Sequence, residues 1–157
     1  HALKVSDFQR MYKKLDMAMM TNQESVVVGL WPFDERTEYY LSSTFSRFIT
    51  ILSQWIFKQF NVDGTILCYS HCFAYSKEAA VRIFPNIYSY GYSFEHEIVC
   101  IAGFFGLYIT SVENELVLRS NLRMESIDRF IELFGLLRFY LAYITDFYAI
   151  VKVSYEK

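Results

Sequence analysis

Three cysteines and two of the three histidines are the residues best suited to metal or covalent chemistry. They are Cys68, His71, Cys72, His96 and Cys100. Zinc prefers thiolate and imidazole ligands in a tetrahedral arrangement, and the spacing of Cys68 and His71 is that of a paired zinc ligand. Alternatively, these residues belong to buried strands, where a free cysteine is an ordinary small apolar side chain. A strand would turn His71 away from its neighbouring cysteines, so we favour the second interpretation and expect no metal.

Covalent catalysis would need a thiol or hydroxyl beside a base. The candidates are Cys72, Ser42 and Ser43, with His71 or His96 as the base. Neighbours in sequence rarely have the geometry that such a pair requires, and the chain has no Gly-x-Ser-x-Gly turn to expose a serine. We therefore expect no catalytic residue and predict that the protein is not an enzyme.

Acid–base and phosphate chemistry are no better supported by the sequence. Glu95 and Glu97 flank His96, but alternate residues of a strand share one face, which would leave both carboxylates solvated. Gly103 and Gly106 lack the lysine and the strand–loop–helix setting of a phosphate-binding loop. The formal net charge of -2 and the pI near 5.9 argue against nucleic acid, which binds basic surfaces. We expect no cofactor and no nucleic acid partner.

An aromatic segment in the middle of the chain alternates with small residues. Tyr88, Tyr90, Tyr92 and Phe94 follow the two-residue period of a strand and would share one face of it. Such a face stacks on bases in single-strand binders, but neighbouring glutamates would repel a phosphate backbone. We favour a sheet face packed under a long helix, and the alternative is a tyrosine-rich contact with a protein partner.

The chain closes on a segment, 124–153, that is helical in pattern and apolar on most of its circumference. Its main apolar face contains Phe130, Leu133, Leu137, Tyr140, Leu141, Ile144, Tyr148 and Val151. The opposite side is interrupted by Ile131, Phe139, Tyr143 and Ile150. A helix that is apolar on both sides must be covered on both sides, by its own domain, another subunit or a partner. This segment therefore predicts assembly rather than catalysis.

Small residues recur along the less apolar side of that helix. Gly135, Ala142 and Ala149 are spaced by seven residues, and Arg138 lies between the first two. A line of small residues lets a second backbone approach closely. It marks either a crossing with the predicted helix at 36–60 or a seam between subunits, and we predict an interaction site at these four residues and at the aromatic segment.

Composition limits the domain organisation and the compartment. At 157 residues we expect one domain, 1–157, excised from a longer protein because the chain opens on His1. Hydrophobic residues make up 54% and aromatic residues 19% of the chain, both high for a soluble domain. The odd number of cysteines is typical of a reducing compartment, either cytoplasmic or nuclear. The longest uncharged run, 98–112, is too short for a transmembrane segment.

The order of elements predicts an α+β fold. We expect helices at 5–20, 36–60, 76–82 and 124–153, and strands at 26–31, 65–75, 88–94, 97–100, 104–110 and 116–119. The expected buried faces are Val5, Phe8, Tyr12, Leu15 and Met19 of the first helix, and Leu41, Phe45, Phe48, Leu52, Trp55 and Ile56 of the second. The predicted fold is a mostly antiparallel sheet packed against two long amphipathic helices, with a short N-terminal helix.

Three functional hypotheses follow. The first is a non-enzymatic protein–protein interaction or assembly domain, which binds through the terminal helix and the aromatic strand. The second is a module that encloses an apolar small molecule or lipid between the sheet and the long helices. The third is a small zinc protein or enzyme built on the cysteine and histidine group described above.

Overall fold

The computed structural model describes residues 4–21, 23–30, 44–62, 69–87, 93–113 and 126–145. Within these ranges the chain forms an α+β fold of five α-helices, a short 3-10 helix and a three-stranded mixed sheet. The elements in chain order are α1 (Val5–Met20), β1 (Ser25–Leu30), α3 (Thr44–Gln59), β2 (Tyr69–Tyr75), α4 (Lys77–Ile83), η2 (Phe84–Asn86), α5 (Ser93–Phe104), β3 (Tyr108–Glu113) and α6 (Ser126–Ile144).

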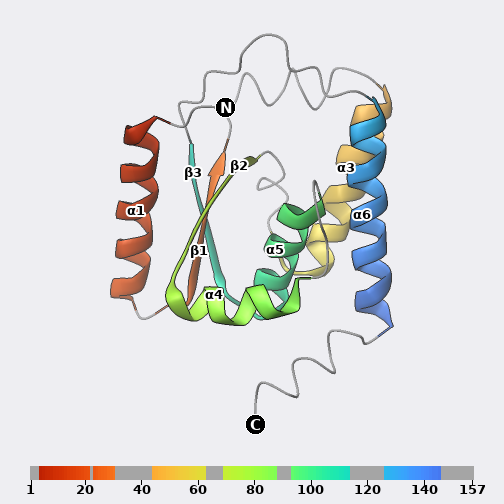
Figure 1. Cartoon of the computed structure of the whole chain (residues 1–157). Helices are drawn as coiled ribbons and strands as arrows, with labels where there is room; N and C mark the ends of the chain where they lie inside the picture. The colour runs from red at the N-terminus through yellow and green to blue at the C-terminus, as the bar shows by residue number, and fades with distance from the viewer. Residues whose placement is uncertain are drawn as a thin grey trace.

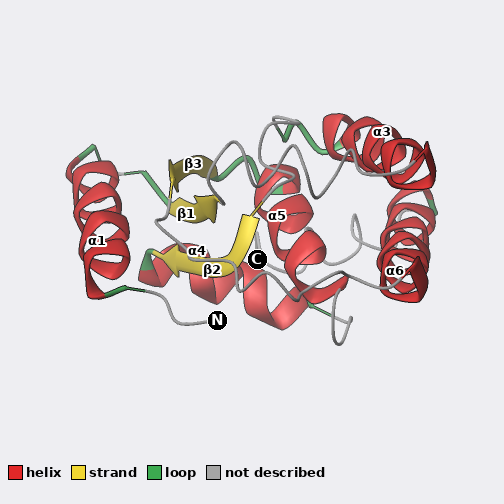
Figure 2. Ribbon diagram, turned by 90° about the horizontal axis from the view of Figure 1, so that it is seen from above, coloured by secondary structure: helices red, strands yellow, loops and turns green. Residues whose placement is uncertain are grey.

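The elements stack in layers across the molecule (Figures 1 and 2). Helix α1 covers one face of the sheet, α5 lies on the other side, and α3 and α6 lie beyond α5. The predicted packing of the sheet against two long helices is therefore wrong in its detail, because α5 separates them from the strands. The N-terminal helix is also not short, since α1 and α3 both have 16 residues.

Strand β1 lies at the centre of the sheet, in the order β2-β1-β3. It pairs antiparallel with β2, with Val27 opposite Ala74, and parallel with β3, with Val27 opposite Thr110. The expectation of a mostly antiparallel sheet is corrected accordingly. Parallel pairing needs a long crossover between the two strands. Here the chain passes through α3, β2, α4 and α5 between β1 and β3. The pairing begins where the Tyr108 N–H donates a hydrogen bond to the Glu24 carbonyl, next to the start of β1.

Every residue of β1 is buried, which explains its unbroken apolar sequence. Val27 faces α1 and packs with Met11, Leu15 and Cys72 in a small cluster. Val26 and Val28 belong to the larger core on the other side of the sheet, together with residues of α3, α5 and α6. One central strand thus joins two cores of different size.

Helix α1 has the predicted bounds but buries a different face. Met11, Leu15 and Ala18 face the sheet, whereas the other members of the predicted face, Val5, Phe8, Tyr12 and Met19, are exposed. Asp7 joins the buried side, where its carboxylate accepts a hydrogen bond from the Lys4 backbone N–H at 3.2 Å and pairs with Arg10 at 2.6 Å. Because these two donors satisfy the carboxylate, its burial is tolerated.

Helix α3 is likewise rotated relative to its predicted face, and residues 36–43 of the predicted helix lie outside the described ranges. Its buried side consists of Ile49, Thr50, Ser53, Ile56, Phe57 and the following Phe60. Phe45, Phe48 and Trp55, which were expected inside, are exposed. Because large apolar residues occupy more than half of the helical circumference, the pattern alone does not decide which side meets the core.

The segment predicted as strands at 97–100 and around Phe94 is a helix. Residues 96–103 of α5 are all buried, so polar and apolar residues do not alternate there with the period of a helix or of a strand. Phe104, expected to begin a strand, ends α5, and β3 begins at Tyr108. Residues 112 and 113, which follow the predicted strand at 104–110, are the end of β3.

Two local features hold α5 and α4 in place. A Cβ atom at Gly103 would overlap the carbonyl oxygen of Phe60, so only glycine allows α5 to pass this close to the end of α3. At α4, the Ser76 hydroxyl accepts hydrogen bonds from the N–H groups of Ala79 and Ser25, both at 3.2 Å. Ser76, the first residue of the helix predicted at 76–82, is thus the N-cap of α4, and it also ties α4 to the first residue of β1.

Candidate functional site

The cysteine and histidine group is not brought together in the described part of the chain. Cys72 lies in the cluster between α1 and the sheet, whereas Cys100 lies in the larger core on α5. Cys68 and the side chain of His71 lie outside what the structure describes, as do Ser42 and Ser43. Among the described residues, no three His, Cys, Asp or Glu side chains are arranged to hold a metal ion.

The two described thiols lie in surroundings that disfavour the thiolate form. Burial raises the pKa of Cys72, and the nearby Asp7 carboxylate raises it further. Burial also raises the pKa of Cys100 well above its ordinary value, with a further contribution from Glu97. Nucleophilic and metal-binding cysteines need the opposite, a pKa lowered by a positive neighbour. Both thiols therefore behave as apolar core side chains.

His96 and Glu97 are core residues of α5. The imidazole of His96 stacks on the ring of Phe57 from α3, with ring centroids 5.7 Å apart and planes inclined by 9°. Glu97 is 1% exposed, so the expectation that Glu95 and Glu97 share a solvated strand face is wrong. On a helix, residues two apart point in different directions, which explains why Glu95 is half-exposed while Glu97 is enclosed.

The predicted aromatic strand is described only at its end. Phe94 is half-buried on α5 and packs against the larger core, so its assignment to a strand face is wrong. Tyr88, Tyr90 and Tyr92 lie outside the described residues, and their predicted role stays a prediction.

The small residues of α6 lie at the margin of the chain's own core. Ala142 packs against that core, Gly135 is half-buried and Arg138 is exposed, while Ala149 lies outside the described residues. The contact at Ala142 favours the intramolecular interpretation of this line over a seam between subunits.

Among the described residues, the largest group of exposed large apolar side chains lies on α3 and α6. We call it the α3/α6 surface, and it consists of Phe48, Ile51 and Trp55 from α3 and Phe130, Ile131, Phe134, Leu141 and Ile144 from α6. Ile51 and Phe134 are each 65% exposed and Phe48 is 58% exposed. Phe130, Leu141 and Ile144 belong to the main apolar face predicted for this segment, whereas the buried side of α6 centres on Leu133, Leu136 and Phe139.

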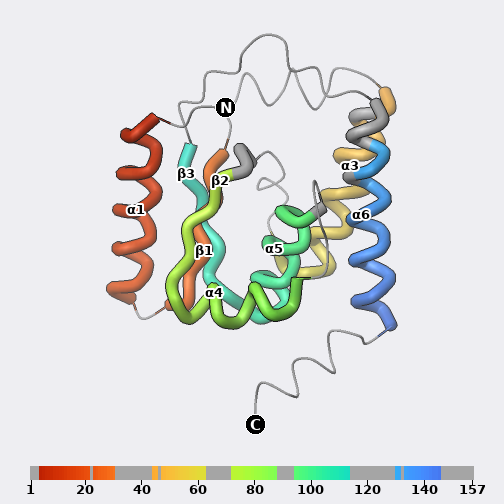
Figure 3. The backbone as a smooth tube through the Cα atoms, in the orientation of Figure 1, coloured from red at the N-terminus to blue at the C-terminus, as the bar shows by residue number. Residues whose placement is uncertain are grey.

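Contacts between the two helices bring the elements that carry these side chains together. The rings of Trp55 and Tyr140 meet edge to face, with centroids 5.1 Å apart. Just after the end of α3, the ring of Phe60 contacts the rings of both Phe139 and Tyr143 from α6, with centroid distances of 5.0 and 4.4 Å. The backbone trace shows α3 and α6 side by side and running in the same direction, on the end of the molecule opposite α1 (Figure 3).

The described charges on this surface are positive and lie at its edges. Arg47 and Lys58 are the only charged residues of α3, whose 16 residues include no acid. Arg138 is the exposed charge among the described side chains of α6. All three are exposed. Each lies three or four residues from a member of the surface: Arg47 from Ile51, Lys58 from Trp55 and Arg138 from Phe134.

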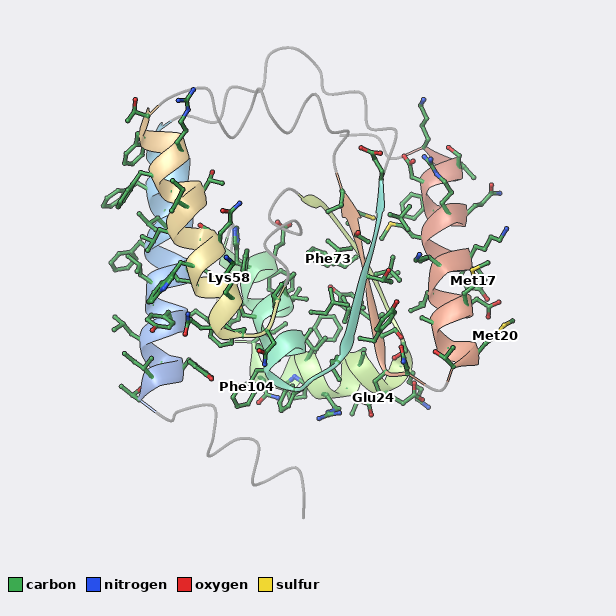
Figure 4. The ribbon with its side chains drawn as sticks, turned by 180° about the vertical axis from the view of Figure 1, so that it is seen from behind. Met17, Met20, Glu24, Lys58, Phe73 and Phe104 are labelled. Atoms are coloured by element: carbon green, nitrogen blue, oxygen red, sulfur yellow. The ribbon has the colours of Figure 1, made fainter. Side chains whose placement is uncertain are left out.

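A second group of exposed apolar side chains lies on α1. Met17 and Met20 project away from the sheet (Figure 4), and Val5, Phe8, Tyr12 and Met19 are exposed as well. Lys13, Lys14 and Asp16 of the same helix are also exposed. The exposed apolar side chains of α1 thus come from one helix, whereas those of the α3/α6 surface come from two adjacent helices.

The sequence analysis did not predict which apolar side chains of α6 are exposed, and it did not predict the exposed apolar side chains of α3. The sequence did contain a signal for exposed apolar residues on α3. The helix predicted at 36–60 has nine large apolar residues between 45 and 60, more than one buried face can hold. The aromatic and aliphatic residues in excess of that face had to remain outside the core.

Comparison with family models, curated proteins and solved structures finds no match for this chain. Across the described ranges, none of the helices combines the length and apolar character needed to span a membrane.

Proposed function

We propose that this protein is a non-enzymatic interaction or assembly domain that binds another protein through the α3/α6 surface. The observation that carries the proposal is the number of large apolar side chains exposed on two adjacent helices, eight in the α3/α6 surface. Continuous exposed apolar areas are rare on monomeric proteins and mark sites of association. Phenylalanine and tryptophan are also the residues enriched at the centres of protein interfaces.

The energetics of exposure support the same conclusion. Fully burying a Phe, Leu or Ile side chain stabilises a complex by about 1.5–3 kcal/mol. These side chains are already partly covered by their own helices, so each would contribute a fraction of that value on binding. Several together are needed to offset the entropy lost on association, which makes a two-helix surface a more credible site than a single residue.

The proposal includes an intracellular location, in the cytoplasm or nucleus. Cys72 and Cys100 are free thiols that belong to different clusters on opposite sides of the sheet. A reducing compartment suits buried thiols of this kind.

The second hypothesis, an apolar ligand enclosed between the sheet and the long helices, has less support. Helix α5 occupies that layer, and its residues 98–102 fill it with buried side chains. A ligand there would have to displace the core itself. The third hypothesis also loses support, because Cys72 and Cys100 lie apart and both have raised pKa values.

The test replaces two central residues of the surface with charge, as the double variant Ile51→Glu and Phe134→Glu. Val81→Glu is the matched control, since Val81 is an exposed apolar residue of α4 outside the surface. We expect native protein and control to associate, either with themselves in light scattering or with partners captured by affinity purification. The double variant loses this association while keeping its circular dichroism spectrum. Association that is equal in all three proteins contradicts the proposal.

A further inference from the structure

We infer that the occupant of the α3/α6 surface is an amphipathic helix of another protein whose apolar stripe is flanked by acidic residues. This inference rests on the proposed function and names the kind of partner. It follows from the charges at the edges of the surface and from the arrangement of the two helices.

The positions of the basic residues define two positive edges. Lys58 follows Ile51 by seven residues, so it lies almost directly below Ile51 on the same side of α3. Arg138 has the same relation to Ile131 on α6 and follows Phe134 by four residues. Since Trp55 contacts Tyr140 at the junction of the helices, Lys58 and Arg138 lie on the outer margins, one on each helix.

Neither basic residue is used inside the described structure. Lys58 and Arg138 form no ion pair with the described residues, and both are exposed. An occupant that covers the apolar centre would bring its own flanking side chains against these two charges. Acidic side chains at those positions form favourable pairs, and basic ones are repelled.

The arrangement of the two helices favours a helix as the occupant. Helices α3 and α6 lie side by side (Figure 3), and a third helix can pack against such a pair with its apolar residues at i, i+3, i+4 and i+7. With 16 residues, α3 offers a length of about 24 Å, enough for roughly four turns of a partner helix. The side chains on either margin of that helix reach the outer edges of α3 and α6.

A second copy and a membrane fit these charges less well. In a symmetric pair of identical chains the same basic edges would face each other, and like charges at an interface are unfavourable. Recruitment to an anionic bilayer relies on clusters of four to eight basic residues. The described side chains on this surface include three, namely Arg47, Lys58 and Arg138.

The experiment uses two helical peptides of about 18 residues, a length that supports helix formation. They share one leucine and isoleucine stripe and carry either glutamate or lysine at the flanking positions. Fluorescence anisotropy measures their affinity for the native chain. We expect the glutamate peptide to bind about tenfold more tightly than the lysine peptide, because several weak surface pairs change sign together. The preference should weaken as salt is added.

The charge-reversal variant Lys58→Glu with Arg138→Glu supplies the decisive comparison. We expect it to prefer the lysine peptide by a similar factor. The variant Lys13→Glu with Lys14→Glu, which makes the same charge change on α1, should retain the native preference. Urea unfolding of both variants verifies that they fold, since all four positions are exposed.

Several results overturn the inference. These are equal affinity for the two peptides, failure of both to bind at millimolar concentration, or a preference that survives reversal of Lys58 and Arg138. Two further results assign the surface to another occupant: a dimer lost in Phe134→Glu, or sedimentation with phosphatidylserine vesicles that is lost in the same variant. If partner capture depends on Phe134 but no peptide preference appears, the proposed function survives. If capture is independent of Phe134, both proposals fail.

Discussion

The two ends of the molecule expose apolar side chains in different ways. Helix α1 buries a narrow ridge of Met11, Leu15 and Ala18 against the sheet, and its exposed apolar residues belong to this one helix. On α3 and α6 large apolar side chains are exposed on two adjacent helices, with basic residues among them. The comparison teaches that exposed apolar side chains gathered on neighbouring elements, rather than the exposure of single residues, mark a candidate binding surface.

The most damaging change that we predict is Phe60→Ala, at the junction of α3, α5 and α6. Phe60 is 1% exposed and contacts Phe139 and Tyr143. Its truncation should lower the free energy of unfolding by about 3–5 kcal/mol, measured by urea denaturation. Phe48→Ala on the same helix should cost about 0.5 kcal/mol or less, because Phe48 is exposed. Equal effects of the two truncations would mean that the outer side of α3 is part of the core.

At the other end of the molecule, Met11→Ala should destabilise the fold by about 2–3 kcal/mol. Met11 is buried between α1 and the sheet, and its sulfur lies 3.3 Å from the Cys72 Sγ. The loss should be smaller than for Phe60→Ala because the α1 cluster is small. Tyr12→Ala is the control, since Tyr12 is exposed and the substitution should leave the urea midpoint nearly unchanged. A loss at Tyr12 larger than at Met11 would place the predicted rather than the observed face of α1 against the sheet.

A smaller effect is expected at the link between α4 and β1. Ser76→Ala removes the acceptor for the N–H groups of Ala79 and Ser25 and should cost about 1 kcal/mol in thermal or urea unfolding. Ser76→Asp retains an acceptor at the N-cap and should recover part of the loss. No difference between alanine and aspartate would show that the cap hydrogen bond contributes nothing measurable.

The smallest effect on stability is expected from the α3/α6 surface itself. Ile51→Ser and Phe134→Ser remove apolar area from exposed positions, so each should change the free energy of unfolding by about 0.5 kcal/mol or less. Solubility should rise at the same time, because exposed apolar area promotes association. A large loss of stability in either variant would show that the side chain is covered by its own chain.

Part of this fold could be predicted from local signals. The bounds of α1, the buried run of β1 and the cap of α4 at Ser76 follow from residue patterns that act within one element. The face that each helix buries could not be predicted from such patterns. Helices α1 and α3 have apolar residues on more than one side, and tertiary packing determines which side is buried.

Other features depend on contacts between distant segments. Residues 96–103 of α5 are buried so completely that their sequence carries no periodic signal, which explains the strand predicted at 97–100. Phe94 was predicted in a strand because it continues the two-residue alternation of the preceding tyrosines. The parallel pairing of β1 with β3 depends on the position of the end of α5, after which β3 begins beside β1. For the candidate site, the excess of apolar residues predicted exposed apolar area, but its residues depend on how α3 packs against α6.

The most direct test compares association by the two ends of the molecule with matched charge substitutions. Ile51→Glu with Phe134→Glu disrupts the α3/α6 surface, and Phe8→Glu with Tyr12→Glu introduces the same charge on α1, where both residues are exposed. We predict that the first variant loses association with protein partners while the second retains it. Association that survives the first pair of substitutions and is lost with the second would contradict the account.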